Sequence, residues 1–355
     1  MVDPSGVVAE DSVARRVVDG VGVTVALGYP SRLGDPSDEE CRDFLGWFDR
    51  TSDRFRPDVL VSYGGDRLSR EIRARAKRRG IAVVFALHNF AYKDRSAFEA
   101  VDAVIVPSRL AAEHYRRTLG LDCVVLPNLI DLDRVRVPVE ARDPRYVTFV
   151  NPSVEKGVYP FARIADELGR VRPEIPILVV EGRGSERTLA DCGLDLTRRG
   201  NVFLMGHTPD PRQFWGVTRI CLMPSLWWEN QPLVAIEAMC NGIPVVGSDR
   251  GGIPEALGRA GIVLPLSDRL TPQTRELPTL DEVAPWVEAI LRLWDDPAAW
   301  GKQARLAEVE ARRWASEVVE PLHARFFGGI RTLIGGDDRI GGRQGGSSSA
   351  KLEDV

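Results

Sequence analysis

The chain has 355 residues, of which 44% are hydrophobic, and a formal net charge of -4 at pH 7. This length and hydrophobic share suffice for two hydrophobic cores, so we expect two domains. The nearly neutral charge provides no basic surface for nucleic acid. The first residues resemble neither a signal peptide nor a transmembrane segment. The five cysteines are odd in number and lack zinc spacing, which predicts reduced thiols in a cytoplasmic protein.

Short apolar runs alternate with segments of helical period along the whole chain. Such runs predict parallel sheets covered by helices on both faces, so the fold class is α/β with two doubly wound domains. A ligand should then bind outside the carboxyl ends of the strands, in the cleft between the domains. The predicted strands are residues 23–27, 59–63, 82–87, 103–106 and 124–126, followed by 146–150, 177–180, 202–204, 220–223 and 244–247.

The boundary between the domains is expected within residues 130–145, a charged stretch that contains proline. Residues 286–294 and 300–327 have helical patterns. The Gly/Ser-rich residues 335–349 are too polar to pack, so we expect them to be disordered.

Two carboxylates, Glu229 and Glu237, stand at the two ends of a loop that enters a helix. Pro232 suits a helix start, and apolar residues at helical spacing follow it. The start of a helix leaves backbone N–H groups unsatisfied and carries partial positive charge, which together favour a phosphate. The two carboxylates would lie roughly 12 Å apart or more. That span fits the distance from the ribose to the sugar of a nucleotide sugar.

The segment 225–239 resembles the Glu-x7-Glu signature of the family 4 retaining glycosyltransferases, which have the GT-B fold, and residues 240–255 match the family's continuation. Residues 201–207, 222–225 and 127–131 also resemble family motifs in the family's order, so the resemblance covers most of residues 60–315. It implies two Rossmann-like domains, but this sequence departs from the family pattern at its start, where the first domain lacks the opening strand. The expected parts are an acceptor-side domain at 1–138, a nucleotide-sugar-binding domain at 139–310, a helix at 311–333 that crosses back to the first domain, and a disordered tail at 334–355. Residues 10–18 are the expected helix before the first strand.

The resemblance implies a metal-independent enzyme of the hexosyltransferase type. It would move a sugar from a nucleoside-diphosphate sugar to a hydroxyl acceptor with retention of configuration, with UDP as the first expectation and GDP as the next. No cofactor and no metal ligand are expected, and the diphosphate itself would help to remove the acceptor proton. Two alternatives stay open: a degenerate GT-B protein that binds a nucleotide sugar without transfer, and a nucleotide-sugar epimerase.

Three residues match the family's catalytic positions. Glu229 would face the transferred sugar, and Lys156, in a Lys-Gly element after a strand, would stabilise the diphosphate leaving group. His88, at the carboxyl end of a strand, would reach the transferred sugar. On residue type alone, Lys156 also fits a solvated surface lysine, and His88 fits a hydrogen-bonded structural histidine.

The remaining matches concern the donor. Glu237 would accept hydrogen bonds from the ribose hydroxyls. Asn230 and Gln231 stand where the family commonly has Gly-Phe, and because Pro232 lacks an N–H, the backbone of Leu233 and Val234 would meet the phosphate.

Asn151 replaces the family's usual arginine five residues before Lys156, so it can donate a hydrogen bond but carries no charge. Arg183 would replace that charge or flank the nucleobase, and Gly182 belongs to the same turn. An ordinary turn that uses its glycines for backbone reasons fits equally well. Trp227 and Trp228 fit either stacking on the ligand or packing in the core.

Overall fold

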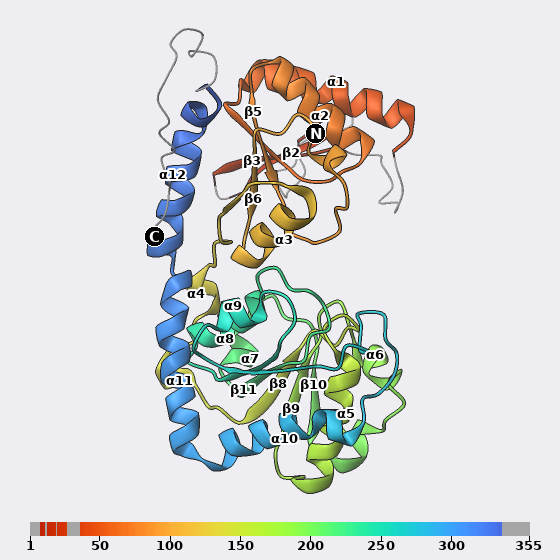
Figure 1. Cartoon of the computed structure of the whole chain (residues 1–355), viewed down its shortest axis with the longest axis vertical. Helices are drawn as coiled ribbons and strands as arrows, with labels where there is room; N and C mark the ends of the chain where they lie inside the picture. The colour runs from red at the N-terminus through yellow and green to blue at the C-terminus, as the bar shows by residue number, and fades with distance from the viewer. Residues whose placement is uncertain (1–7, 11–12, 19, 27–35, 336–355) are drawn as a thin grey trace. The chain divides into compact units, whose positions relative to one another are not determined.

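A computed structural model describes residues 8–10, 13–18, 20–26 and 36–335 of the chain (Figure 1). The contacts divide the chain into two compact units. Within the described residues, the first unit comprises the chain up to Ala86 together with Tyr92–Val104, and the second comprises Leu87–Ala91 and Ile105–Leu333. The boundary expected between residues 138 and 139 stays a prediction.

The N-terminal residues form a three-stranded antiparallel sheet of β1 (Val8–Glu10), β2 (Val13–Val18) and β3 (Val21–Ala26). The helix expected at residues 10–18 is therefore wrong for Val13–Val18. These residues are rich in β-branched valine, and Val18 pairs directly with Val21 in an antiparallel ladder between β2 and β3. The strand predicted at 23–27 is confirmed for residues 23–26, but its partner is antiparallel.

A four-stranded sheet follows in the order β4-β5-β6-β7, in which β4 and β5 are parallel. All four strands lie where the apolar runs predict them. The sheet comprises β4 (Val59–Ser62), β5 (Ala82–Ala86), β6 (Ala103–Val106) and β7 (Cys123–Val125), and the helical elements of this region are α1 (Asp38–Phe55), α2 (Arg67–Arg78), the 3-10 helix Arg95–Phe98 and α3 (Arg109–Leu119).

The second unit contains a parallel six-stranded sheet in the order β10-β9-β8-β11-β12-β13. Successive strands extend one way from β8 and the other way from β11, so the chain changes direction between these two strands. Ligands of doubly wound proteins bind at such a switch point, outside the carboxyl ends of the strands. The strands are β8 (Tyr146–Val150), β9 (Ile177–Val180), β10 (Val202–Met205), β11 (Thr218–Met223), β12 (Val245–Ser248) and β13 (Ile262–Leu264). Among these strands, β13 alone was not predicted from the sequence.

Both faces of this sheet are buried, as the continuous apolar runs predict. Alternate residues of β9 point to opposite faces: Ile177 and Val179 belong to one core cluster, and Leu178 and Val180 to the other. The first cluster includes α5 and α10, and the second includes α8, α9 and α11. The helical elements are α4 (Leu132–Val135), the 3-10 helix Val139–Ala141, α5 (Val158–Val171), α6 (Glu186–Ala190), the 3-10 helix Leu196–Arg199, α7 (Arg212–Trp215), α8 (Leu233–Cys240), α9 (Ile253–Leu257), α10 (Leu280–Asp295), α11 (Pro297–Ala311), the 3-10 helix Arg312–Trp314 and α12 (Ser316–Gly335).

The C-terminal helices differ from the predicted ones in where they begin and end. Residues 286–294 lie within α10, but the helix expected at 300–327 is interrupted by the 3-10 helix at Arg312–Trp314 and continues as α12. Of the expected tail at 334–355, residues 336–355 lie outside the described residues. Within the described part of the chain, no helix combines the length and the apolar character that crossing a membrane requires.

Candidate functional site

A cavity of about 760 Å³ lies in the second unit, beside the carboxyl ends of β8 and β9 and the first turn of α8. Five of the residues expected at the donor site line it: Asn151, Gly182, Arg183, Leu233 and Glu237. Leu233 and Glu237 are four residues apart on α8 and therefore share one face of the helix. The cavity thus combines a helix N-terminus with a carboxylate one turn further along.

The Glu237 carboxylate is anchored at the wall of the cavity. Trp215 Nε1 donates a hydrogen bond of 3.2 Å to Glu237 Oε2. Burial raises the pKa of Glu237, and the Trp215 hydrogen bond and the nearby charge of Arg134 oppose that rise. Among the residues that the structure describes, none donates a hydrogen bond to the second carboxylate oxygen, so Glu237 keeps acceptor capacity for a ligand.

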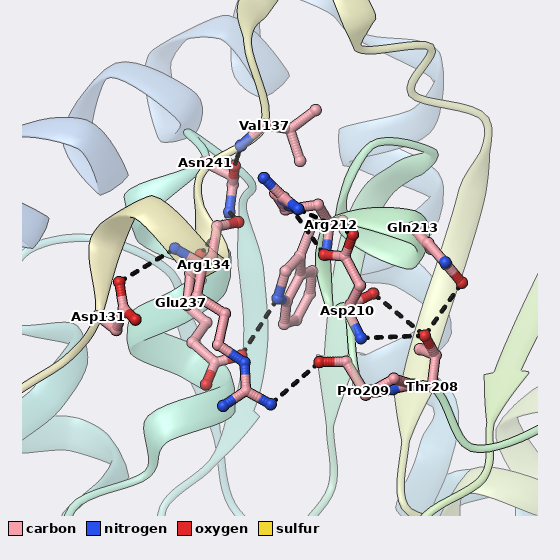
Figure 2. Close-up of polar contacts among 12 residues, drawn as sticks. Asp131, Arg134, Val137, Thr208, Pro209, Asp210, Arg212, Gln213, Glu237 and Asn241 are labelled. Carbon is pink, nitrogen blue, oxygen red and sulfur yellow. Dashed lines mark hydrogen bonds and ion pairs between the residues drawn. The ribbon is translucent and has the colours of Figure 1, made fainter. Parts of the chain in front are cut away.

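Arg134 was not expected from the sequence, although it lines the same cavity. It lies on the short helix α4, whose N-terminus is capped by the Asp131 side chain, and Arg134 Nη2 donates to Pro209 O at 3.0 Å (Figure 2). The guanidinium therefore ties α4 to the turn after β10. An aspartate three residues before it is a helix-start signal that would have indicated this placement.

The far end of α8 is also anchored. Asn241, directly after the helix, accepts a hydrogen bond from Val137 N at 2.8 Å and donates to Val135 O at 3.1 Å, and Figure 2 shows the contact with Val137. The helix that carries Glu237 is thus held to residues 135–137.

Lys156 and Glu229 lie 73 positions apart in the sequence but form an ion pair. Glu229 is only 7% exposed, and Ser225 Oγ donates a second hydrogen bond of 2.9 Å to the same Oε1 atom. Lys156 precedes Gly157, which begins α5 with a φ of 85°. A Cβ at Gly157 would come within 1.8 Å of Pro224 O, so only glycine fits between this helix and the end of β11.

The loop that carries Glu229 packs against the segment after β12. Gly252 N donates to Glu229 O at 2.6 Å. A Cβ at Gly251, whose φ is 57°, would lie 2.5 Å from both Glu229 N and Glu229 O. The adjacent glycines therefore allow two backbones to approach closely, and this contact fixes the main chain at Glu229.

Asn151 has a structural contact that the sequence analysis did not foresee. Its φ is 64°, and its Oδ1 accepts a hydrogen bond from Gly184 N at 2.9 Å. This bond ties the end of β8 to the turn that contains Gly182 and Arg183. The amide thus orders the cavity wall and supplies none of the charge that an arginine would bring.

Asn230, Gln231 and Val234 are not among the residues that line the cavity. Asn230 Nδ2 donates to Leu87 O at 3.4 Å, and Gln231 Oε1 accepts from Asn128 N at 2.7 Å. His88 follows Leu87 directly, and desolvation lowers its pKa.

Trp227 and Trp228 both have exposed side chains. Trp228 also makes edge-on contacts with Phe90 and His114. Among the residues that the structure describes, no group of three or more His, Cys, Asp or Glu side chains could hold a metal ion.

Two family models match this chain. The model described as glycosyl transferases group 1 matches residues 145–296, and the model described as glycosyltransferase family 4 matches residues 9–134. The first match contains the cavity at β8, β9 and α8, apart from its wall at residues 129–135.

One curated relative is the D-inositol 3-phosphate glycosyltransferase of Arthrobacter sp. (strain FB24), which is 29% identical over 125 residues, or 33% of this chain and 26% of the relative. The chain spans less than half of the length of the curated relatives that it matches.

Solved structures show the fold. The sucrose-phosphate synthase of Thermosynechococcus elongatus matches with a TM-score of 0.67 and 18% identity over 95% of this chain and 88% of that one. Alr3699/HepE of Anabaena, solved in complex with UDP, matches with a TM-score of 0.63 and 16% identity over 81% of this chain and 82% of that one. The expected GT-B fold is confirmed.

Proposed function

Because this chain belongs to the glycosyltransferases of group 1 and family 4, we propose that it transfers a sugar from a nucleoside-diphosphate sugar to a hydroxyl group of an acceptor. UDP is the proposed nucleotide, and GDP is the second choice. The transfer would retain the configuration of the sugar and require no metal ion. The observation that carries the proposal is the cavity in which the start of α8 and the Glu237 carboxylate stand one helical turn apart.

This arrangement suits the two chemical features of a nucleoside diphosphate. The N–H groups of Leu233 and Val234 belong to the first turn of α8, where they lack partners within the helix and carry partial positive charge that attracts phosphate. Glu237 would accept hydrogen bonds from the ribose hydroxyls. Because α8 is anchored at Asn241, the two groups would meet the donor at a fixed separation.

Lys156 and Glu229 would supply the transfer step. The diphosphate of a bound donor would compete with Glu229 for the Lys156 ammonium, because both are anions. Lys156 would then stabilise the negative charge that develops on the leaving diphosphate, and Glu229 would accept hydrogen bonds from the transferred sugar. We propose that a diphosphate oxygen takes the acceptor proton as the new glycosidic bond forms on the face that the leaving group vacates.

The choice of UDP rests on the family's common donors, and the solved Alr3699/HepE of Anabaena contains UDP. The first test is a thermal-shift panel of UDP, GDP, ADP and TDP with the full chain. A ligand that binds only the native state adds about 2.7 kcal/mol to the free energy of unfolding at roughly a hundredfold excess over Kd. Glu237→Gln should abolish the UDP shift. Glu288→Gln, an exposed glutamate on α10, should leave it unchanged.

Turnover is tested next by the release of UDP from UDP-sugars with a panel of hydroxyl acceptors, in the presence of EDTA. Proton NMR of the product would report the anomeric configuration. Inversion of configuration or dependence on a divalent metal would contradict the corresponding part of the proposal.

A second candidate is a protein that binds the nucleotide sugar without transferring it. The observation in its favour is Asn151, whose uncharged side chain is engaged with Gly184 N where the family has an arginine. Stabilisation by UDP without release of UDP from any sugar donor would favour this candidate. Interconversion of two UDP-sugars would favour an epimerase.

A further inference from the structure

We infer that residues 228–231, here called the positioning segment, fix the segment 87–91 to the loop that carries Glu229, so that Asn230 acts as a positioning residue for sugar transfer. This inference rests on the proposed function, because it concerns how His88 and Glu229 are held for that reaction. It gives Asn230 a different task from the donor contact expected from the sequence. All of its contacts lie within the second unit.

Asn230 joins two elements that are distant in sequence. Its side chain is 9% exposed, its Nδ2 donates to Leu87 O at 3.4 Å, and its Oδ1 accepts from Ser108 Oγ at 2.6 Å. Ser108 is the N-cap of α3 and accepts from Ala111 N at 3.2 Å. A buried amide with a partner at each end has one preferred orientation. Asn230 therefore connects Leu87, the start of α3 and the loop of Glu229.

Ring contacts support the same segment. Phe90 contacts Trp228 edge-on with ring centroids 5.6 Å apart, and Tyr115 of α3 donates to Asn89 O at 2.6 Å. Residues 87–91 form no helix or strand. Leu87 N donates to Ile105 O at 2.9 Å, and beyond Leu87 the contacts of Asn89 and Phe90 with Tyr115 and Trp228 hold the stretch. Both Asn230 and Trp228 of the positioning segment contact this stretch, one residue on either side of Glu229.

The other side of the positioning segment is also fixed. A Cβ at Gly252 would lie 2.3 Å from Asn230 O, which shows how closely the segment after β12 approaches. Gln231 Oε1 accepts from Asn128 N at 2.7 Å and extends the same line of contacts. Residues 228–231 are thus held between the backbone of Gly252 on one side and the backbones of Leu87 and Asn128 on the other.

The chemical consequence concerns the relative placement of His88 and Glu229. His88 follows the residue that Asn230 binds, and Glu229 precedes Asn230. Displacement of a reacting group by about 1 Å can lower a rate by roughly a hundredfold even when binding is intact. Loss of the Asn230 contacts should therefore reduce turnover while UDP affinity, which depends on Glu237 and the start of α8, is preserved.

The first arm of the test is hydrogen–deuterium exchange of the full chain without ligand. Asn230→Ala should increase exchange in residues 87–91. Ser108→Ala should increase exchange in the same residues. Ser108→Thr keeps the hydroxyl and should leave exchange as in the wild type. The double variant Asn230→Ala/Ser108→Ala should increase exchange little beyond either single variant. The control is Asn201→Ala, another buried asparagine that donates to a backbone carbonyl, at Ile175 O, which should leave residues 87–91 unchanged.

The second arm measures the release of UDP from UDP-glucose and the affinity for UDP. Asn230→Ala should lower kcat by about tenfold to a hundredfold with UDP affinity unchanged. Unchanged exchange at residues 87–91, or weaker UDP binding with unchanged kcat, would overturn the inference. If the wild type releases no UDP from any sugar donor, the proposed function fails, and the exchange arm alone decides whether the positioning segment holds residues 87–91.

Discussion

Replacing Lys156 with Met should leave the Glu229 carboxylate without its cation in a buried position. Glu229 is 7% exposed, and its remaining partner would be the Ser225 hydroxyl. Removing one partner of a buried ion pair typically costs about 3 to 5 kcal/mol. The Lys156 side chain is 30% exposed, so water can partly solvate the site. We therefore expect Lys156→Met to lower the free energy of unfolding by about 2 to 4 kcal/mol.

The partner substitution should behave differently. Glu229→Gln keeps an oxygen acceptor for Ser225, and the partly exposed Lys156 ammonium can turn to solvent, so we expect a loss of about 1 kcal/mol. The double variant Lys156→Met/Glu229→Gln should be more stable than Lys156→Met alone, because no unpaired charge is left buried. The loss in the free energy of unfolding should therefore be larger for Lys156→Met than for Glu229→Gln.

Urea unfolding followed by tryptophan fluorescence would measure these differences, since the chain contains eight tryptophans. Lys302→Met, the same substitution at an exposed lysine of α11, is the control and should change the free energy of unfolding by less than about 0.5 kcal/mol. Two results would refute the reasoning: a Lys156→Met variant as stable as this control, or a double variant whose loss equals the sum of the single losses.

Three further predictions concern single residues. Gly157→Ala should lower stability by about 2 to 5 kcal/mol in thermal melts, because its φ is 85° and its Cβ would overlap Pro224 O; a wild-type melting temperature would contradict this. Glu237→Gln should raise stability at pH 8 and lose this gain below about pH 4. Burial raises the pKa of Glu237 above its ordinary value of 4.5, so the native state binds more protons than the unfolded state. The wild type therefore loses stability as the pH rises past 4.5, and a stability gain of Glu237→Gln that grows toward low pH would contradict this reasoning. Gly251→Ala should displace the Glu229 backbone, and so reduce UDP release more than UDP affinity; equal losses in both would oppose this.

Most strands of the four-stranded and six-stranded sheets could be predicted because each is a continuous apolar run. β13, a three-residue strand at the edge of its sheet, was not predicted, although β7 is equally short and was predicted. The error at Val13–Val18 has a different cause: the helix was expected from the family's order of elements, whereas the valines favour a strand that pairs with its immediate neighbour.

The site could be predicted where its residues lie on a single helix, because their spacing in the sequence then fixes which face they share. Leu233 and Glu237 share a helix face, so their common cavity follows from the sequence. The ion pair of Lys156 and Glu229 was not foreseen, because two strand ends bring together residues 73 positions apart. Trp215 was missed for the same reason, since its contact with Glu237 depends on how α7 packs beside α8.

Asn241 offers a way to alter, from a distance, the cavity that we propose for the donor. It lies about one helical turn beyond Glu237 and bonds to Val135 O and Val137 N. A change in the chain near residue 137 would therefore rotate or shift α8 and alter the place of the Glu237 carboxylate. Evolution could then retune nucleotide preference at positions that never touch the nucleotide, and engineered changes of donor could begin there.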